Sequence, residues 1–133
     1  MLDYYNIDIK GKDVTIIGRS NIVGKPLAHY LTNKDATVTL CHSKTKDLRN
    51  KTINADIVIV AVGHPKLIDA SFIKDNAVVI DVGINRINDK LCGDTDFESL
   101  KDKCSFITPV PGGVGPMTVA MLMDNVVQSA RRR

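Results

Sequence analysis

The chain has 133 residues, of which 44% are hydrophobic and 25% charged, so it has the length and composition of one globular domain with its own core. Three of its 18 basic residues form a terminal run within the basic tail at 130–133, and the fifteen others balance fifteen acidic residues. This balance argues against a nucleic-acid-binding face. Without an apolar run of roughly 20 residues, no membrane-spanning helix is expected.

The cysteines and the first residues indicate the compartment. An odd cysteine count without paired metal-ligand spacing is typical of a reducing cytoplasm, and it predicts neither a disulfide framework nor a metal site. The first residues, MLDYYNIDIK, include acidic side chains and lack the apolar stretch of a secretion signal. We therefore expect a cytoplasmic protein. The cysteines are Cys41, Cys92 and Cys104.

Five short hydrophobic runs rich in β-branched residues predict the strands. Near-continuous runs such as IVIVAV are typical of parallel strands that are buried on both faces. Segments with helical spacing lie between them, and a last helix is predicted from Met117 to Val127. This alternation predicts an α/β fold with a doubly wound parallel sheet in a single domain, interrupted by a small hairpin between Gly83 and Gly93. The predicted strands are Val14–Ile17, Thr37–Leu40, Ile57–Val62, Val78–Val82 and Ser105–Thr108.

The first strand leads directly into the loop GRSNIVG, and a helix is predicted to start near Ile22. A strand, a glycine turn and a helix N-terminus in this order hold a pyrophosphate with backbone N–H groups in Rossmann-like domains. Gly18 permits the tight turn, and Gly24 permits close approach of helix and strand. The usual middle glycine is replaced by Ser20, so a plain turn with a helix-capping serine is the alternative.

The end of the second predicted strand lacks the acidic residue that bonds the ribose 2′-hydroxyl in NAD-binding folds. The segment CHSKT, from Cys41 to Thr45, stands there instead. Its hydroxyl and cationic side chains suit a 2′-phosphate, which the forked guanidinium of Arg19 could reach from the first turn. The pattern favours NADP over NAD, and a solvated polar loop is the alternative.

Glycines and prolines gather where the later strands end. Gly63 and Gly83 follow the third and fourth predicted strands, at the sheet edge where ligands of α/β proteins bind. The segment TPVPGGVGPMT, from Thr108 to Thr118, is rigid and poor in side chains, and Pro116 suits the first turn of the helix that follows. Such a loop leaves room for a flat ligand beside the backbone. A structural cap on the fifth strand is the alternative.

These segments together resemble a known family. GRSNIVGKP, CHSKT, AVG, DVGIN, GD and TPVPGGVGPMTVAML are similar, in order and spacing, to the cofactor domain of bifunctional methylenetetrahydrofolate dehydrogenase/methenyltetrahydrofolate cyclohydrolases, from about Asp8 to Asn125. The resemblance implies NADP as cofactor and a folate substrate in one-carbon metabolism. The dehydrogenase step moves a hydride from 5,10-methylenetetrahydrofolate to NADP, and the cyclohydrolase step adds water to give 10-formyltetrahydrofolate. It also implies a homodimer.

The position of each residue in the matched motifs implies its contact. The pyrophosphate and adenosine end would contact Gly18, Arg19, Ser20 and Ile22, with Arg19 and Ser43 on the 2′-phosphate. The path from adenine to nicotinamide would be flanked by Val62, Gly63, Ile84 and Thr118. Pro111 and Gly115 would lie nearest the folate.

The family's catalytic residues, a Tyr-x-x-x-Lys pair with a Gln and an Asp, belong to an N-terminal domain that this sequence does not contain. We expect residues 1–12 to correspond to the helix and turn between the two domains, and the chain to be an inactive fragment without catalytic residues. Tyr30 and Lys34 match the spacing of the pair but fall at the far end of the first helix, over about 10 Å from the phosphate loop. His42 and His64 are interpreted as loop residues.

Two other functions remain open at this point. A stand-alone nucleotide-binding or scaffolding module would use the same loop without catalysis. A different reductase of the same fold, similar to shikimate dehydrogenases, would share the strand order, but the PVPGGVGPMT segment argues against it.

Overall fold

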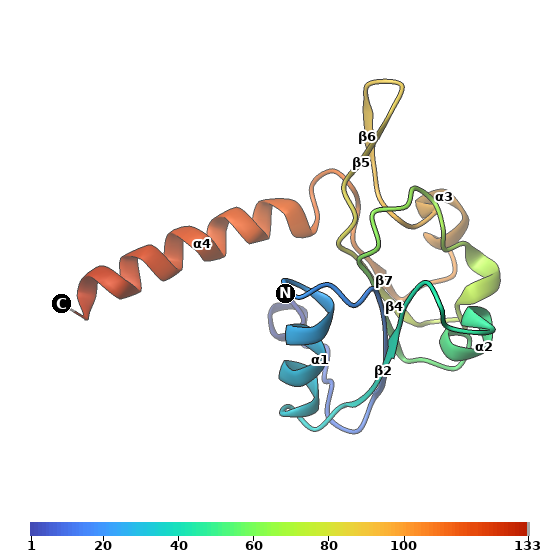
Figure 1. Cartoon of the computed structure of the whole chain (residues 1–133), viewed down its shortest axis with the longest axis horizontal. Coiled ribbons are helices and arrows are strands. Elements are labelled where there is room, and N and C mark those ends of the chain that lie inside the picture. The colour runs from blue at the N-terminus through green and yellow to red at the C-terminus, as the bar shows by residue number, and fades with distance from the viewer. Residues whose placement is uncertain (133) are drawn as a thin grey trace.

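The computed structural model describes residues 1–132 and centres on a five-stranded parallel sheet (Figure 1). The strand order is β2-β1-β3-β4-β7, so the chain winds outward in both directions from β1 and β3. This confirms the predicted doubly wound α/β fold. The strands are β1 (Asp13–Ile17), β2 (Thr37–Cys41), β3 (Ile57–Val60), β4 (Val78–Asp81) and β7 (Phe106–Ile107).

Helices cover both faces of the sheet and produce two hydrophobic cores. On one face, α1 (Gly24–Thr32) packs Leu27 and the buried Leu31 against β1 and β3. On the other face lie α2 (Leu48–Thr52), the 3-10 helix η2 (Ala70–Phe72) and α3 (Phe97–Leu100). The central strand β3 is buried along its whole length, which explains its continuous run of aliphatic residues.

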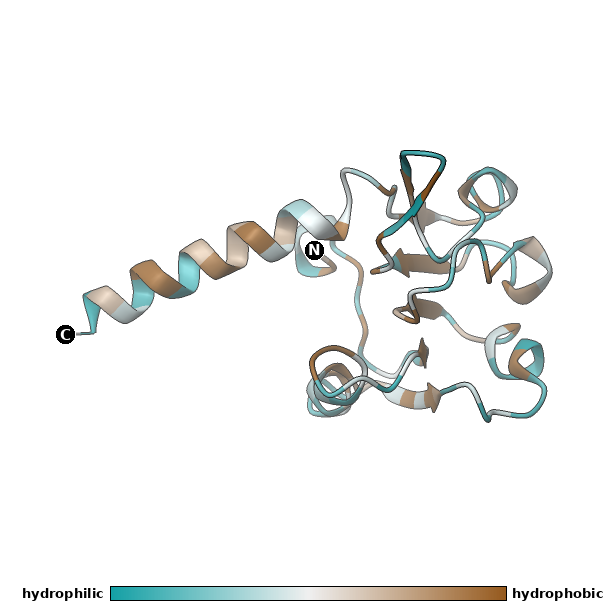
Figure 2. Ribbon diagram, turned by 45° about the horizontal axis from the view of Figure 1, so that its top comes forward, coloured by the Kyte–Doolittle hydropathy of each residue, from teal (hydrophilic) through white to brown (hydrophobic). Residues whose placement is uncertain are grey.

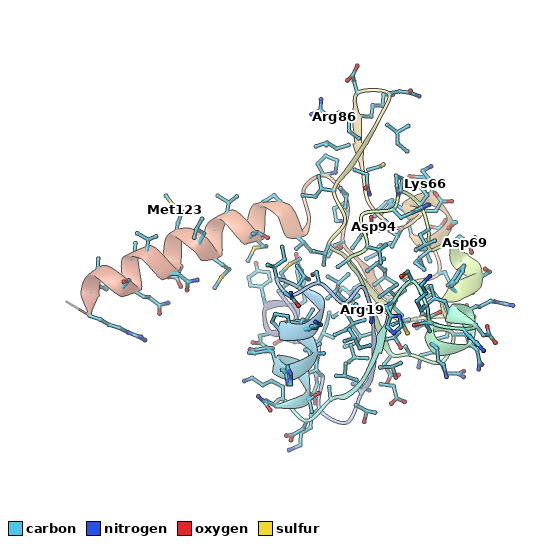
Figure 3. The ribbon with its side chains drawn as sticks, viewed as in Figure 1. Arg19, Lys66, Asp69, Arg86, Asp94 and Met123 are labelled. Atoms are coloured by element: carbon cyan, nitrogen blue, oxygen red, sulfur yellow. The ribbon has the colours of Figure 1, made fainter. Side chains whose placement is uncertain are left out.

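The predicted hairpin is present as β5 (Asn85–Ile87) and β6 (Lys90–Cys92), which pair antiparallel and project from the body of the domain (Figure 1). Its base joins the carboxyl end of β4 to the segment that leads into α3. Arg86, on β5, is labelled near the outer part of the hairpin in Figure 3. The hairpin therefore extends from the same sheet edge at which the ligand-binding loops are expected.

The last helix, α4 (Val114–Arg131), extends away from the rest of the chain (Figure 1). It is longer than the predicted Met117 to Val127 and contains no buried residue. Figure 2 shows hydrophobic residues along it, and Met123 points into open space in Figure 3. The part of the expected basic tail at residue 133 lies outside the described residues. The large hydrophobic residues exposed on α4 are Met117, Val119, Met121, Leu122, Met123, Val126 and Val127.

A hydrophobic groove of about 650 Å³ lies beside the start of α4. It is bounded by the short helix η1 (Asp3–Tyr5), by the neighbouring strands β4 and β7, and by the first turn of α4. Tyr5 and Phe106 meet across it with ring centroids 6.1 Å apart. Within residues 1–132, no helix is both long enough and apolar enough to cross a membrane.

Candidate functional site

The loop after β1 lies where the strand order of the sheet reverses. Gly18 has φ of +119°, and a Cβ atom there would overlap the carbonyl oxygen of Ala61 at the end of β3. Its backbone N–H donates to the carbonyl oxygen of Cys41 at the end of β2, at 2.9 Å. Gly18 is therefore held between the ends of β2 and β3, in the crevice where open α/β sheets bind their ligands.

Ser20 organises the start of α1. Its hydroxyl oxygen accepts from the backbone N–H groups of Val23 at 3.1 Å and Gly24 at 3.4 Å. The helix begins at Gly24, so the expectation of a helix from near Ile22 is wrong by about one half-turn. Residues 21–23 form a turn before the helix, in which the N–H group of Val23 bonds to Ser20. Ile22 gains no core contact and is 87% exposed.

The loop between Gly18 and Val23 presents backbone donors. The N–H groups of residues 19–22 find no acceptor among the described residues, whereas those of Val23 and Gly24 bond to Ser20. Uncommitted N–H groups ahead of a helix N-terminus form a site for an anion. The capping role of Ser20, considered as the alternative to phosphate binding, coexists with these donors and does not compete with them.

The loop after β2 carries the polar residues expected beside a 2′-phosphate. Thr45 accepts from the backbone N–H of His42 at 2.8 Å, which folds the loop back on itself and leaves Ser43 and Lys44 exposed. The next acidic residue, Asp47, accepts from the N–H of Asn50 at 3.2 Å and so caps α2. No acid is thus placed to bond a ribose 2′-hydroxyl from this loop. Arg19 is exposed and is seen between α1 and α2 in Figure 3.

A second part of the edge lies over β4 and β7. A cavity of about 180 Å³ is lined by the end of β4, the base of the hairpin and the segment from Pro109 to Pro116. Ile84 faces Gly115 across it, because a Cβ atom on Gly115 would lie 3.6 Å from Ile84 Cδ1. Pro111 follows a cis peptide bond in the same segment. Thr118 is one turn further along α4, where its hydroxyl donates to the carbonyl oxygen of Val114 at 3.2 Å.

The structure therefore divides the expected site residues between two clusters on one edge of the sheet. Val62 and Gly63, at the end of β3, lie between the two clusters. The cluster around β1 and β2 contains Gly18, Arg19, Ser20, Ile22 and Ser43, and the cluster around β4 and β7 contains Ile84, Pro111, Gly115 and Thr118.

Sequence reasoning assigned no role to two buried carboxylates at the same edge. Asp81 accepts from the N–H groups of Gly83, Asp94 and Thr95 and from the Thr95 hydroxyl, at 2.6 to 3.0 Å. Asp94 accepts from Val62, Gly63 and Asn85. The only signal in the sequence was their place in the short segments DVGIN and GD, which carried the family resemblance but indicated neither a role nor a partner for either carboxylate.

Other chemistry-bearing residues lie apart from this edge. Lys34 Nζ is 5.9 Å from the ring centroid of Tyr30 at the far end of α1, and Tyr30 is 55% exposed, so the pair forms a surface cation–π contact. Burial raises the pKa of the Cys41 thiol, with the Thr45 hydrogen bond acting in the opposite direction. Across residues 1–132, no group of three or more His, Cys, Asp or Glu residues is placed to hold a metal ion.

Comparison with known proteins agrees with this geometry. The family described as tetrahydrofolate dehydrogenase/cyclohydrolase, NAD(P)-binding domain, matches residues 1–133. The chain belongs to this family. The bifunctional protein FolD of Agathobacter rectalis is 61% identical over 133 residues, covering 99% of this chain and 48% of that protein. The FolD of Bacillus subtilis is 59% identical, covering 99% and 47%.

Solved structures of the family superpose closely. The FolD dehydrogenase/cyclohydrolase of Campylobacter jejuni gives a TM-score of 0.98 at 55% identity, covering 99% of this chain and 47% of that one. The Trypanosoma brucei enzyme, solved with NADP cofactor and inhibitor, gives 0.94 at 41% identity, covering 98% and 47%. The chain is thus an NAD(P)-binding domain and spans about half the length of these relatives.

Proposed function

We propose that this chain supplies the NADP-binding half of a methylenetetrahydrofolate dehydrogenase/methenyltetrahydrofolate cyclohydrolase. In that role it holds NADP as the hydride acceptor, while a folate bound between the two halves is oxidised and then hydrolysed. Residues 1–12 would lead from the catalytic half into this domain. The chain itself contributes no catalytic residue, so the isolated domain is inactive in both steps.

The observation that carries the proposal is the pairing of two features on neighbouring strands. The loop after β1 offers the uncommitted N–H groups of residues 19–22, and the loop after β2 offers Ser43 and Lys44 without an acid. A pyrophosphate fits the first and a 2′-phosphate fits the second. Arg19 is the exposed first residue of the loop after β1, and its guanidinium suits bidentate phosphate binding.

The remaining contacts follow from the strand order. With the adenosine end at β2 and the pyrophosphate at β1, the dinucleotide crosses β3 at Val62 and Gly63. The nicotinamide then reaches the cavity beside Ile84, with Thr118 at its rim and with Pro111 and Gly115 toward the folate. The exposed hydrophobic side of α4 and the adjacent groove of about 650 Å³ are surfaces that a catalytic half would cover.

Cofactor choice is tested by calorimetric titration of the chain with NADPH and with NADH. NADPH is expected to bind more tightly, and Arg19→Ala should reduce this preference by roughly 10- to 100-fold, because a hydrogen bond to a charged group contributes about 1.5–3 kcal/mol. The matched control is Arg86→Ala on the hairpin, whose side chain is 67% exposed and which should keep the preference. Equal binding of NADH and NADPH by the unaltered chain would contradict the 2′-phosphate assignment.

Catalysis is tested by assaying NADPH formation from methylenetetrahydrofolate. The chain alone should show no turnover, and addition of a separately produced catalytic half from a relative should restore it. Turnover by the chain alone would show that the expected division of labour is wrong. Cofactor binding without restored turnover would instead favour the alternative, a nucleotide-binding module without catalysis.

Assembly and location belong to the same proposal. A homodimer is expected for the complete enzyme, and light scattering of that enzyme would give twice the chain mass, whereas the mass of one chain would contradict it. A cytoplasmic location is supported by the unpaired state of Cys41, Cys92 and Cys104.

A further inference from the structure

Two carboxylates are buried at the ligand edge of the sheet, and neither has a cationic partner among residues 1–132. Asp94 is 0% exposed and Asp81 is 1% exposed. Removing a carboxylate from water is costly unless hydrogen bonds replace its hydration. Asp94 meets this requirement with N–H donors, and Asp81 meets it with N–H donors and the Thr95 hydroxyl. Such donors form shorter and stronger hydrogen bonds to a carboxylate than to a neutral oxygen. The partners of these two groups therefore identify what their burial achieves.

Asp94 ties together the ends of two strands. Its Oδ2 atom accepts from the backbone N–H groups of Val62 at 2.7 Å and Gly63 at 2.9 Å, just beyond β3. Its Oδ1 atom accepts from Nδ2 of Asn85, the first residue of β5, at 2.8 Å. In the sequence, Val62 and Gly63 lie 32 and 31 residues before Asp94, and Asn85 lies 9 residues before it. One side chain thus links the backbone that follows β3 to the side chain of the first residue of β5.

The backbone of Asp94 is held as well as its carboxylate. Its own backbone N–H donates to Asp81 Oδ1 at 3.0 Å, and Asp81 is fixed by Thr95, whose N–H and hydroxyl both donate to Oδ2. The carboxyl group also fills the space in which a residue at position 83 would place a Cβ atom. Gly83 is therefore required by Asp94.

Gly93 and Asp81 are related in the same way as Gly83 and Asp94. A Cβ atom on Gly93 would overlap the carboxylate of Asp81. The two glycine–aspartate pairs interlock, each glycine making room for the other segment's carboxylate. Figure 3 shows Asp94 within the body of the domain, beneath the hairpin, whereas Asp69 lies on its outer side.

The hydrogen bonds of Asp81 and Asp94 lie on the proposed path of the cofactor, and this position gives them a function. In the proposed binding mode, the adenosine 2′-phosphate lies at β2 and the pyrophosphate at β1, so only the nicotinamide half passes the ends of β3 and β4. Val62, Gly63 and Ile84 form that part of the edge. Asp94 bonds directly to the backbone of Val62 and Gly63, and through Asn85 it holds the residue next to Ile84. A substitution of Asp94 should therefore weaken the binding of the nicotinamide half and leave the binding of the adenosine half unchanged.

We propose that Asp94 is a positioning residue that sets the backbone of Val62 and Gly63 for the nicotinamide half of the cofactor. The proposal rests on the proposed NADP-binding function of this edge. Asp94 acts through the two N–H groups and through Asn85, and does not itself touch the dinucleotide. Asp81 serves it by holding the backbone of residue 94.

The test separates the two halves of the cofactor. Calorimetry of the chain with NADPH and with adenosine 2′,5′-bisphosphate, which lacks the nicotinamide half, gives two dissociation constants for each variant. Asp94→Ala should weaken NADPH binding by about tenfold or more while changing the binding of the bisphosphate by less than about threefold. A purely structural loosening would weaken both ligands to the same extent, and thermal unfolding recorded in parallel gives the stability change.

The conservative variant Asp94→Asn should recover most of the NADPH affinity. Its amide oxygen accepts from the N–H groups of Val62 and Gly63, and Asn85 can turn its own oxygen toward the new NH₂ group. The matched control is Asp69→Ala. Asp69 also accepts a backbone N–H, from Ser71 at 2.8 Å, but it caps η2 away from the edge. Its loss should leave the ratio of the two dissociation constants unchanged.

A second pair of variants keeps the test decisive if Asp94→Ala does not fold. Asn85→Asp places two carboxylates against each other and should weaken NADPH selectively, and the exchange variant carrying Asn85→Asp and Asp94→Asn should restore binding because the pair is complementary again. Equal losses for both ligands, or no recovery in the exchange variant, would overturn the positioning role. Absence of NADPH binding by the unaltered chain would overturn the proposed function itself, and the positioning role with it.

Discussion

The α-carbon of Gly24 lies directly against the backbone carbonyl group of Gly18. A Cβ atom at position 24 would overlap the carbonyl oxygen of Gly18 and would lie 3.0 Å from the Cα atom of Arg19. The two glycines of the loop therefore meet in space, and the first turn of α1 rests on the turn that leaves β1. This contact brings the helix N-terminus to the crevice between β1 and β3.

Gly24→Ala should cost about 1–3 kcal/mol of unfolding free energy, because the added methyl group meets backbone and not a flexible side chain. It should also weaken NADPH binding, since the displaced turn carries the N–H groups of residues 19–22. Urea unfolding and calorimetry measure the two effects. Gly115→Ala is the stability control, because its nearest neighbour would be Ile84 Cδ1 at an ordinary 3.6 Å, and it should not destabilise the chain. Equal unfolding curves for Gly24→Ala and the unaltered chain would contradict the close contact.

Polar substitutions on α4 should leave the fold intact. Leu122 is 62% exposed, so Leu122→Gln should change the unfolding free energy by less than about 0.5 kcal/mol. The buried Leu31 on α1 is the comparison, and Leu31→Ala should cost about 2–5 kcal/mol. Thermal and urea unfolding of both variants measure the difference. A comparable loss in the two variants would mean that α4 packs on its own domain in solution.

Stability should respond to acid through Asp56. The pKa of its carboxyl group is lowered, first by the hydrogen bond from Lys74 Nζ at 2.6 Å and then by the bond from the backbone N–H of Asp13 at 3.0 Å. Because the folded-state pKa is lower than the unfolded value of about 3.9, the stabilisation is complete above that value and disappears as the pH falls through the folded-state pKa.

Asp56→Asn should therefore cost about 1 kcal/mol near neutral pH, a modest figure because the carboxylate is one-third exposed, with a side-chain exposure of 33%. The difference from the unaltered chain should shrink as the pH falls below about 4. The control is Asp75→Asn. Asp75 is 84% exposed and its ion pair with Lys103 is long, at 3.6 Å, so this substitution should change the unfolding free energy little at any pH. A loss in Asp56→Asn that is constant with pH would assign the effect to the Asp13 hydrogen bond and not to charge.

Local patterns predicted the elements well because their causes are local. Continuous aliphatic runs are typical where a parallel strand is covered on both faces. β3 follows this rule along its whole length, and the buried parts of β1 and β4 follow it apart from Thr15 and Asp81. The errors occur at their ends. β3 was expected to continue to Val62 but ends at Val60, since the N–H groups of Val62 and Gly63 turn to Asp94 and leave the ladder. Asp94 lies 32 residues from Val62, so the local sequence around Val62 does not reveal this hydrogen bond.

The sequence by itself determined the order of the elements, the doubly wound fold, the phosphate loop and the family, because periodicity, glycine placement and motif spacing are properties of neighbouring residues. Only the tertiary structure decided that Asp81 and Asp94 are buried at the ligand edge. It likewise decided that Gly83 and Gly93 are needed there, because a Cβ atom at either position would overlap one of these carboxylates. It also decided that α4 leaves its hydrophobic side uncovered within the described chain. These features depend on which donors and surfaces meet across long stretches of chain, and folding alone brings them together.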